Sequence, residues 1–145
     1  MISFENDYSE GVHERILEQL VATNMDQQPG YGSDTYSLQA AEKIKDMMDC
    51  PDATVKFLVG GTQTNQVVID AMLDKHEGVI AAETGHISVH EAGAIEVTGH
   101  KVLTIPATNG KIAAADVERF IATFYQDDNY EHMVFTGMVY ISYPT

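Results

Sequence analysis

Basic residues are scarce in this chain, and their scarcity excludes several kinds of partner. Eight Lys and Arg stand against 22 Asp and Glu, so the formal net charge of the 145 residues is -14 at pH 7. A basic patch that could displace counterions from nucleic acid, or bind anionic lipid, is therefore not expected. The sequence predicts neither nucleic acid nor a membrane surface as a partner.

Cysteine and long apolar runs are equally scarce. Cys50 is the single cysteine, which excludes an internal disulfide and fits a reducing compartment. No signal-peptide pattern opens the chain, and no apolar run approaches the ~20 residues of a membrane span. We therefore expect a cytoplasmic protein, and its 44% hydrophobic and 21% charged residues are ordinary for a soluble globular domain.

The rest of the chain is organised around residues 55–65, VKFLVGGTQTN. The apolar, β-branched run 55–59 predicts a strand, Gly60 and Gly61 predict a tight turn, and a helical pattern follows. Unpaired backbone N–H groups and the positive end of the helix dipole converge at such a turn, where the hydroxyls of Thr62 and Thr64 can join them. This arrangement favours a phosphate site, although two glycines can also serve only to turn the chain.

This turn differs from the two familiar phosphate loops. It lacks the lysine of the P-loop, and it has neither the third glycine nor the spacing of the dinucleotide-binding fingerprint. A nucleoside triphosphatase and a dinucleotide-binding enzyme are therefore not predicted. A small phosphorylated cofactor remains open.

Strands alternate with helices along the sequence. Helical spacing occurs at residues 11–24, 34–50 and 111–126 and after the glycine turn, a further helix is expected within 87–94, and strands are expected at 55–59, 79–82, 101–105 and 138–141. This order predicts an α/β fold with a largely parallel sheet flanked by helices. We expect one domain over 1–145, with an arm at 1–10, helices at about 11–50 and an α/β core at about 54–145.

Three segments are expected to meet at one edge of the sheet. The glycine turn, the loop around His86 and residues 142–145 each follow a predicted strand, and ligands bind at the carboxyl ends of parallel strands. No covering helix follows the strand at 138–141, and parallel sheets need cover on both faces. We therefore expect these residues to be the front part of a longer protein.

Two aromatic side chains are further candidates for ligand contacts. His86 and His90 lie four residues apart beside Glu91, but no third ligand is evident, so no metal site is predicted. His86 suits a flat ring laid against a planar ligand, and it also suits an imidazole satisfied by backbone at a helix start. Tyr31, between two glycines, suits a ring presented to a ligand or a neighbouring subunit, although a tyrosine that covers a core edge is the more frequent case.

Four separated segments together resemble a known family. ISFENDYSEG, PGYGSDTYS, FLVGGTQTN and TGHISVHEAGAIEVTGHKV are similar, in this order, to the N-terminal part of the β-eliminating lyase and threonine aldolase family. The resemblance covers nearly the whole chain. It implies part of the large domain of the aspartate aminotransferase fold, pyridoxal 5'-phosphate (PLP) as cofactor, an amino acid as substrate, and a homo-oligomer, either a dimer or a tetramer.

The resemblance also implies roles for five residues near the cofactor. Gly60, Gly61 and Thr62 match the turn that grips the cofactor phosphate. His86 matches the catalytic imidazole that stacks on the pyridine ring, and Glu91 is a second catalytic candidate, for a polar contact near that ring.

Substrate contacts are implied for the N-terminal arm and one loop. Asn6 and Asp7 lie where the family's arm reaches the active site, and Tyr31 lies where a tyrosine approaches the substrate. Many aldolases have Ser-Asp-Thr where this chain has Asn6-Asp7-Tyr8, so the resemblance leaves the choice of amino acid open.

The expected reaction is the cleavage of a β-hydroxy amino acid to glycine and an aldehyde. The alternative within the family is β-elimination from an aromatic or sulfur amino acid. None of the six lysines matches the family's Schiff-base lysine motif, so the 145 residues alone are expected to be inactive. A further alternative is an inactive fragment that only associates with itself or with a partner.

Overall fold

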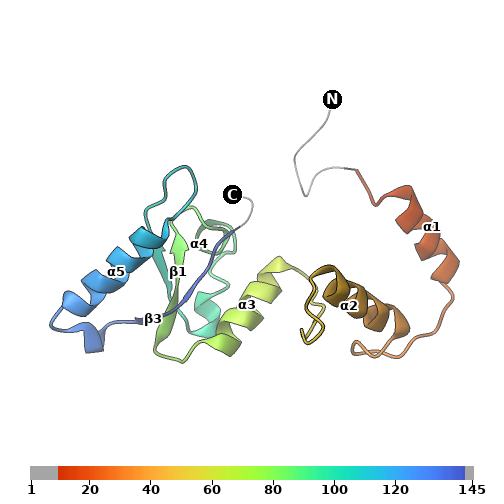
Figure 1. The fold of residues 1–145 in the computed structure, drawn as a ribbon, viewed down its shortest axis with the longest axis horizontal. Helices are drawn as coiled ribbons and strands as arrows, with labels where there is room; N and C mark the ends of the chain where they lie inside the picture. Colours follow the sequence, from red (N-terminus) through yellow and green to blue (C-terminus); the bar gives the residue numbers. More distant parts are fainter. Residues whose placement is uncertain (1–9, 143–145) are drawn as a thin grey trace. The chain divides into compact units, whose positions relative to one another are not determined.

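The chain divides into two compact units, residues 1–57 and residues 58–145. The computed structural model describes residues 10–142 (Figure 1). The prediction of one domain over 1–145 stays a prediction.

In its described residues, 10–57, the first unit contains two helices, α1 (Glu14–Thr23) and α2 (Thr35–Met47). These confirm the helices predicted at 11–24 and 34–50. The imidazole of His13 caps α1, and the carboxylate of Asp34 caps α2 by accepting from the backbone N–H of Ser37 at 2.7 Å. Neither helix has a buried residue. The apolar residues of α1 are exposed, and those of α2 are exposed or, like Ile44, half-buried.

The second unit is a small parallel α/β structure. Its strands are β1 (Glu77–Ala82), β2 (Val102–Ile105) and β3 (Phe135–Val139), and its helices are α3 (Gly61–Met72), α4 (His86–Val89), α5 (Ala114–Gln126) and two short 3-10 helices, η1 (Glu96–Thr98) and η2 (Tyr130–His132). The strand order is β2-β1-β3, and both neighbours run parallel to β1. The predicted α/β fold with a parallel sheet is therefore confirmed.

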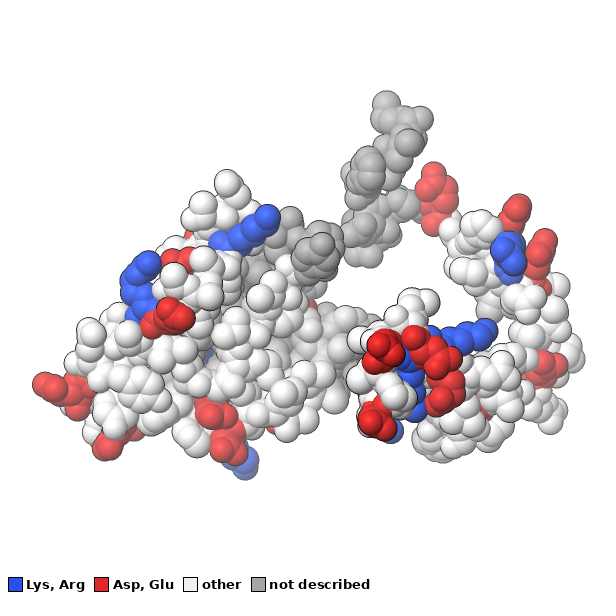
Figure 2. Space-filling model, viewed as in Figure 1, with Lys and Arg blue, Asp and Glu red and all other residues white. Residues whose placement is uncertain are grey.

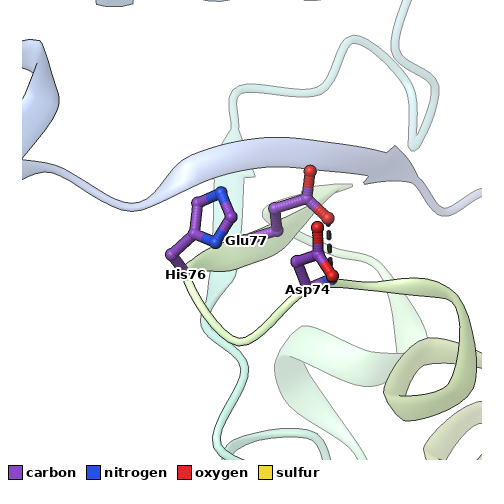
Figure 3. Close-up of side chains that lie close together, drawn as sticks. All are labelled: Asp74, His76 and Glu77. Carbon is purple, nitrogen blue, oxygen red and sulfur yellow. Dashed lines mark hydrogen bonds between the residues drawn. The ribbon is translucent and has the colours of Figure 1, made fainter.

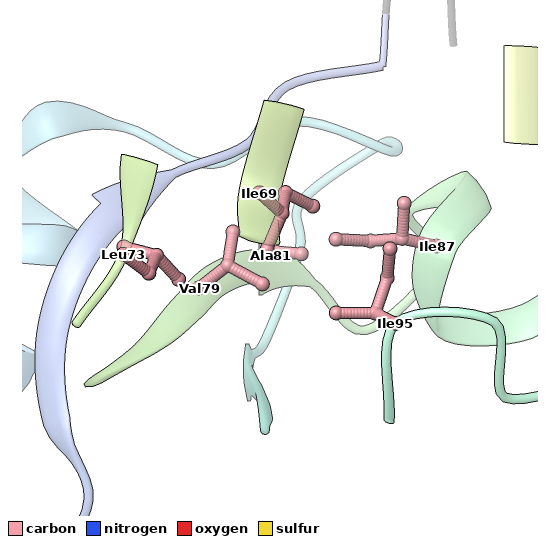
Figure 4. Close-up of a cluster of buried hydrophobic side chains, with 6 residues drawn as sticks. All are labelled: Ile69, Leu73, Val79, Ala81, Ile87 and Ile95. Atoms are coloured by element: carbon pink, nitrogen blue, oxygen red, sulfur yellow. The ribbon is translucent and has the colours of Figure 1, made fainter. Parts of the chain in front are cut away.

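The hydrophobic core is built around β1. Every residue of β1 after Glu77 is buried, because neighbouring strands lie on both sides and helices lie on both faces. On one face, side chains from β1, α3, α4 and the segment before η1 form a single cluster (Figure 4), which comprises Ile69, Leu73, Val79, Ala81, Ile87 and Ile95. Ile80 alternates to the other face of the sheet, and in Figure 1 that face is covered by α5, whose Phe124 is buried.

The strand predicted at 55–59 is wrong. These residues have no regular secondary structure, and Val59 is 93% exposed. A strand needs a partner for its backbone groups, whereas the N–H of Val59 donates to the side chain of Gln63 at 3.0 Å. The boundary between the two units falls inside this stretch, after Phe57.

The helix expected within 87–94 is shorter than predicted. It ends at Val89, because the backbone of His90 leaves the helical conformation with φ of -121°. Ala92 and Gly93 then take left-handed conformations, with φ of 50° and 75°, so the helix does not resume there. Within the described residues, no helix has the length and apolarity required to cross a membrane. On the face shown in Figure 2, the few Lys and Arg side chains stand next to acidic ones and do not gather into a patch.

Candidate cofactor site

The N-terminus of α3 carries the glycine turn. Gly60 is the N-cap with an extended backbone, and no side chain caps the helix. Apart from chain neighbours and the nearby backbone of α3 itself, no atom lies within 4 Å of the position that a Cβ would take at Gly60 or Gly61, so a ligand can approach this backbone closely. The first N–H groups of an α-helix have no partner inside the helix, and the dipole favours an anion beside them.

The two hydroxyls of this turn differ in availability. Thr64 donates its hydroxyl hydrogen to the carbonyl of Gly60 at 2.9 Å, which closes the first turn of α3. The side chain of Thr62 has no hydrogen bond to any described residue and is exposed. Of the two threonines nominated from the sequence, Thr62 is therefore the one whose hydroxyl is available to a ligand.

A hydrogen-bond network connects α3 to His86. The side-chain amide of Asn65 donates to Oε1 of Glu91 at 2.6 Å, and Nδ1 of His86 lies 2.7 Å from the same oxygen. The side chain of Glu91 is fully buried, whereas that of His86 is 53% exposed. The imidazole is thus held at one nitrogen by a buried carboxylate and still presents much of its ring to solvent.

The backbone of His86 is held by the end of β3. Its N–H donates to the hydroxyl of Ser142 at 3.0 Å. β1 leads into His86 and β3 leads into Ser142, so the expected meeting of these two segments at the carboxyl edge of the sheet is found. A cavity of about 270 Å³ lies at this edge and is lined by Gly85, Lys111, Tyr140 and Ser142, among others.

Three of the predicted site residues belong to residues 1–57 and not to the second unit. Asn6 and Asp7 lie outside the described residues. Tyr31 belongs to the first unit, is fully exposed and has a left-handed backbone with φ of 60°. Its ring therefore does not cover a core edge in the described structure, and its predicted contact with substrate stays a prediction.

A second group of potential ligand atoms lies at the turn between α3 and β1. Asp74, His76 and Glu77 place ligand atoms within 4.8 Å of one another (Figure 3). However, Oε2 of Glu77 accepts from the backbone N–H of Asp74 at 2.8 Å, and the N–H of Glu77 donates back to the carbonyl of Asp74. The imidazole of His76 packs against the ring of Phe135 at 5.4 Å between centroids. These contacts account for the cluster as a closed turn.

Sequence reasoning missed two residues of the network, Asn65 and Ser142. Asparagine is a poor residue for the interior of a helix, because its amide competes for backbone hydrogen bonds. Asn65 lies one turn inside α3, and that placement was a readable signal of a special role. For Ser142 the sequence predicted only the place, because residues 142–145 follow a predicted strand at the same edge as the loop around His86. It did not predict the hydrogen bond between these residues, which lie 56 positions apart in the chain.

Comparison with known proteins finds a matching family and several related proteins. The family model described as Beta-eliminating lyase matches residues 7–142. Two curated relatives, the low specificity L-threonine aldolases of a Pseudomonas species and of Pseudomonas aeruginosa, are each 28% identical over 129 residues, which is 88% of this chain and 37% of theirs. A solved structure of Leishmania major threonine aldolase matches with a TM-score of 0.85 at 46% identity, over 94% of this chain and 39% of that one. The chain therefore spans well under half the length of these relatives.

Proposed function

This chain belongs to the beta-eliminating lyase family, and on that premise we propose that it is the N-terminal part of a PLP-dependent lyase of the threonine aldolase type. The reaction is the cleavage of the carbon–carbon bond of a β-hydroxy amino acid, which yields glycine and an aldehyde. The observation that carries the proposal is the network through Asn65 and Glu91, because it connects an anion-binding helix start to an exposed imidazole. The names of the relatives support the choice of reaction.

The residues present fit PLP at both ends of the cofactor. The open space beside Gly60 and Gly61 admits a phosphate to the free N–H groups of α3, and the hydroxyl of Thr62 can donate to it. The half-exposed ring of His86 offers a flat surface to a pyridine ring. When bound, PLP supplies an electron sink for the electron pair released as the carbon–carbon bond breaks.

The residues of this chain bind and orient in the proposed site. The backbone of Gly60 and Gly61 binds the phosphate, and His86 fixes the plane of the pyridine ring. Glu91 holds the hydrogen at Nδ1 of His86 and so keeps the imidazole in place. We propose that Asn6, Asp7 and Tyr31 contact the amino acid substrate, as the family resemblance implies.

Several properties of the whole protein belong to the same proposal. We propose a cytoplasmic protein, and the resemblance supports a homo-oligomer, a dimer or a tetramer. We expect the 145 residues alone to be inactive, because they span 37% of the curated relatives and none of their lysines matches the family's Schiff-base lysine motif. An inactive fragment that only associates with itself or a partner is the corresponding alternative for the isolated chain.

The complete gene product that contains this chain tests the reaction. Incubated with PLP and L-threonine, it is expected to release glycine and acetaldehyde in equal amounts, measured by amino acid analysis and by coupled reduction of the aldehyde. The description of the family model favours one second candidate, β-elimination. Pyruvate and ammonia from an aromatic or sulfur amino acid, without glycine from threonine, would replace the aldolase assignment by that candidate.

Cofactor binding tests the site independently of the reaction. In the same gene product, Gly61→Val is expected to lower PLP affinity, because the added side chain occupies the open space at the start of α3. Gly11 also has open space around it but lies outside α3, so Gly11→Val is the matched control and should leave PLP affinity unchanged. Equal affinities for wild type and Gly61→Val would contradict the phosphate site.

A further inference from the structure

Glu91 is buried in an unusual way for a carboxylate. Its side chain is fully buried, and both contacts are made by Oε1, which accepts from Asn65 and lies 2.7 Å from Nδ1 of His86. The other oxygen, Oε2, is buried and has no partner among the described residues. An unsatisfied buried polar atom costs free energy of folding, so the position of Glu91 is not explained by stability alone.

The contact with Glu91 determines which nitrogen of His86 carries the hydrogen. A carboxylate oxygen accepts hydrogen bonds, so the hydrogen between the two groups belongs to Nδ1 of the imidazole. Nε2 then keeps its lone pair. Because the backbone N–H of His86 is also held by Ser142, the ring is attached at its backbone and at one edge.

Asn65 is the second residue that contacts this carboxylate oxygen. One hydrogen of its amide goes to Oε1 of Glu91 at 2.6 Å, and its nitrogen lies 3.5 Å from the hydroxyl of Tyr140. The carboxylate oxygen requires a donor, and an asparagine amide supplies two N–H bonds in one plane. Since Asn65 lies in the second turn of α3, it couples the orientation of the His86 ring to the helix that carries the glycine turn.

We propose that Asn65 and Glu91 form a positioning pair, which fixes His86 as the Nδ1–H tautomer with its ring held relative to the N-terminus of α3. The pair acts through His86 and does not itself contact a ligand. The inference rests on the proposed function only for the identity of the ring that His86 faces, because the tautomer and the orientation belong to the protein without cofactor.

The tautomer can be measured without any cofactor. In the complete, ¹⁵N-labelled gene product at about pH 9, where a free imidazole is neutral, long-range ¹H–¹⁵N spectra distinguish the nitrogen that carries hydrogen from the one that does not. The signals of His86 are assigned by their loss in His86→Ala. We expect Nδ1 of His86 to show the shift of a protonated nitrogen and Nε2 that of an unprotonated one. The reverse pattern in the wild type would overturn the proposal.

Three variants separate positioning from a general structural role. Glu91→Leu removes the acceptor and is expected to shift His86 toward the Nε2–H tautomer, whereas Glu91→Gln retains an acceptor oxygen and should keep the Nδ1–H tautomer. Asn65→Ala should shift the tautomer in the same direction as Glu91→Leu but less. An unchanged tautomer in Glu91→Leu would overturn the positioning pair. If Glu91→Leu does not fold, the test rests on the wild type and Glu91→Gln, and an Nε2–H tautomer in either would overturn the proposal.

Cofactor affinity completes the test. Glu91→Leu removes an unsatisfied oxygen but leaves the amide of Asn65 without its acceptor, so its Tm can fall whether or not the pair positions His86. The tautomer separates the two roles, because a purely structural role predicts that it is unchanged. PLP affinity should fall in Glu91→Leu and be retained in Glu91→Gln.

The two proposals can fail independently. If the tautomer responds as expected but neither the wild type nor any variant binds PLP, the proposed function is wrong and the positioning pair is supported. If PLP binds and the tautomer does not respond, only the pair fails.

Discussion

The two units of this chain use amphipathic helices in opposite ways. In the first unit, α1 and α2 present apolar residues at helical spacing, yet neither helix has a buried residue. In the second unit, α3 and α5 pack on a parallel sheet, and all buried hydrophobic residues of the described structure belong to this unit. Helical spacing therefore predicts where a helix forms, whereas burial depends on whether a second apolar surface is available.

The residues of the proposed cofactor site are also divided between the two units. The glycine turn, His86, Glu91 and Asn65 all belong to the second unit, where the sheet and α3 fix their relative positions. The residues expected to contact substrate come from the first unit or from outside the described range. The anchoring part of the proposed site is thus built on the packed unit.

Two isoleucines on helices give the largest expected contrast. Ile69 on α3 is 1% exposed, and Ile16 on α1 is 52% exposed. Ile69→Ala is expected to lower the free energy of unfolding by about 2–5 kcal/mol, because it leaves a cavity in the core. Ile16→Ala is expected to change it by less than about 0.5 kcal/mol. Urea unfolding of both variants measures this contrast, and a similar cost at Ile16 would show that α1 is buried against a surface outside the described residues.

Two glycines test packing in the same manner. A Cβ at Gly78 would lie 2.6 Å from the backbone oxygen of Lys101, whereas no atom lies within 4 Å of a Cβ at Gly30. Because a backbone atom has to move, Gly78→Ala is expected to cost roughly 1–3 kcal/mol. Gly30→Ala should cost less than about 0.5 kcal/mol. Thermal unfolding of the two variants checks this, and equal Tm values would contradict the close approach at β1.

The binding contributions of the two units can be separated in the complete gene product. Loss of the stacked ring in His86→Ala is expected to raise the Kd for PLP by roughly 3–10-fold. Tyr31→Phe is expected to raise KM for the amino acid by a similar factor, with the Kd for PLP unchanged. The exposed His132 is the control for His86, and His132→Ala should change neither constant. An effect of Tyr31→Phe on PLP affinity would contradict the assigned roles.

The different N-caps of α2 and α3 predict a smaller contrast, in how the two helices respond to acid. Hydrogen bonds from the side chain and then the backbone of Ser37 lower the pKa of Asp34 below its ordinary value of 3.8. A carboxylate with a lowered pKa in the folded state stabilises α2 above its unfolded pKa, and the stabilisation is lost as the pH falls through the folded value. α3 has no side-chain cap to titrate.

Chemical shifts of backbone nuclei between about pH 7 and about pH 2 measure this difference. In acid, the backbone nuclei in the first turn of α2 should lose their helical chemical shifts. Those in the first turn of α3 should keep them, because no capping side chain titrates there. Asp34→Asn keeps a capping oxygen without the titration, so its α2 should be insensitive to acid. Loss of helical shifts in Asp34→Asn at the same pH would show that another group is responsible.

Much of the fold was predictable from local signals. Helical spacing and Asp34 predicted α2 and its start, and apolar runs between glycines and polar turns predicted β1 and β2. The run at 55–59 carries the same local signal as β1, yet it forms no strand. A segment forms a strand only when a neighbouring strand pairs with its backbone. A single sequence shows a preference for the strand conformation but does not show which segment will pair with it.

The amino-acid sequence by itself determined the α/β class, the helices, the glycine turn at the start of α3 and the resemblance to the family. Tertiary structure alone decided that Glu91 is buried, that Asn65 and His86 share one of its oxygens, and that Ser142 holds the backbone of His86. The reason is physical. Helices and turns depend on interactions within a few residues, whereas these hydrogen bonds join groups up to 56 positions apart and exist only when the sheet and α3 have packed.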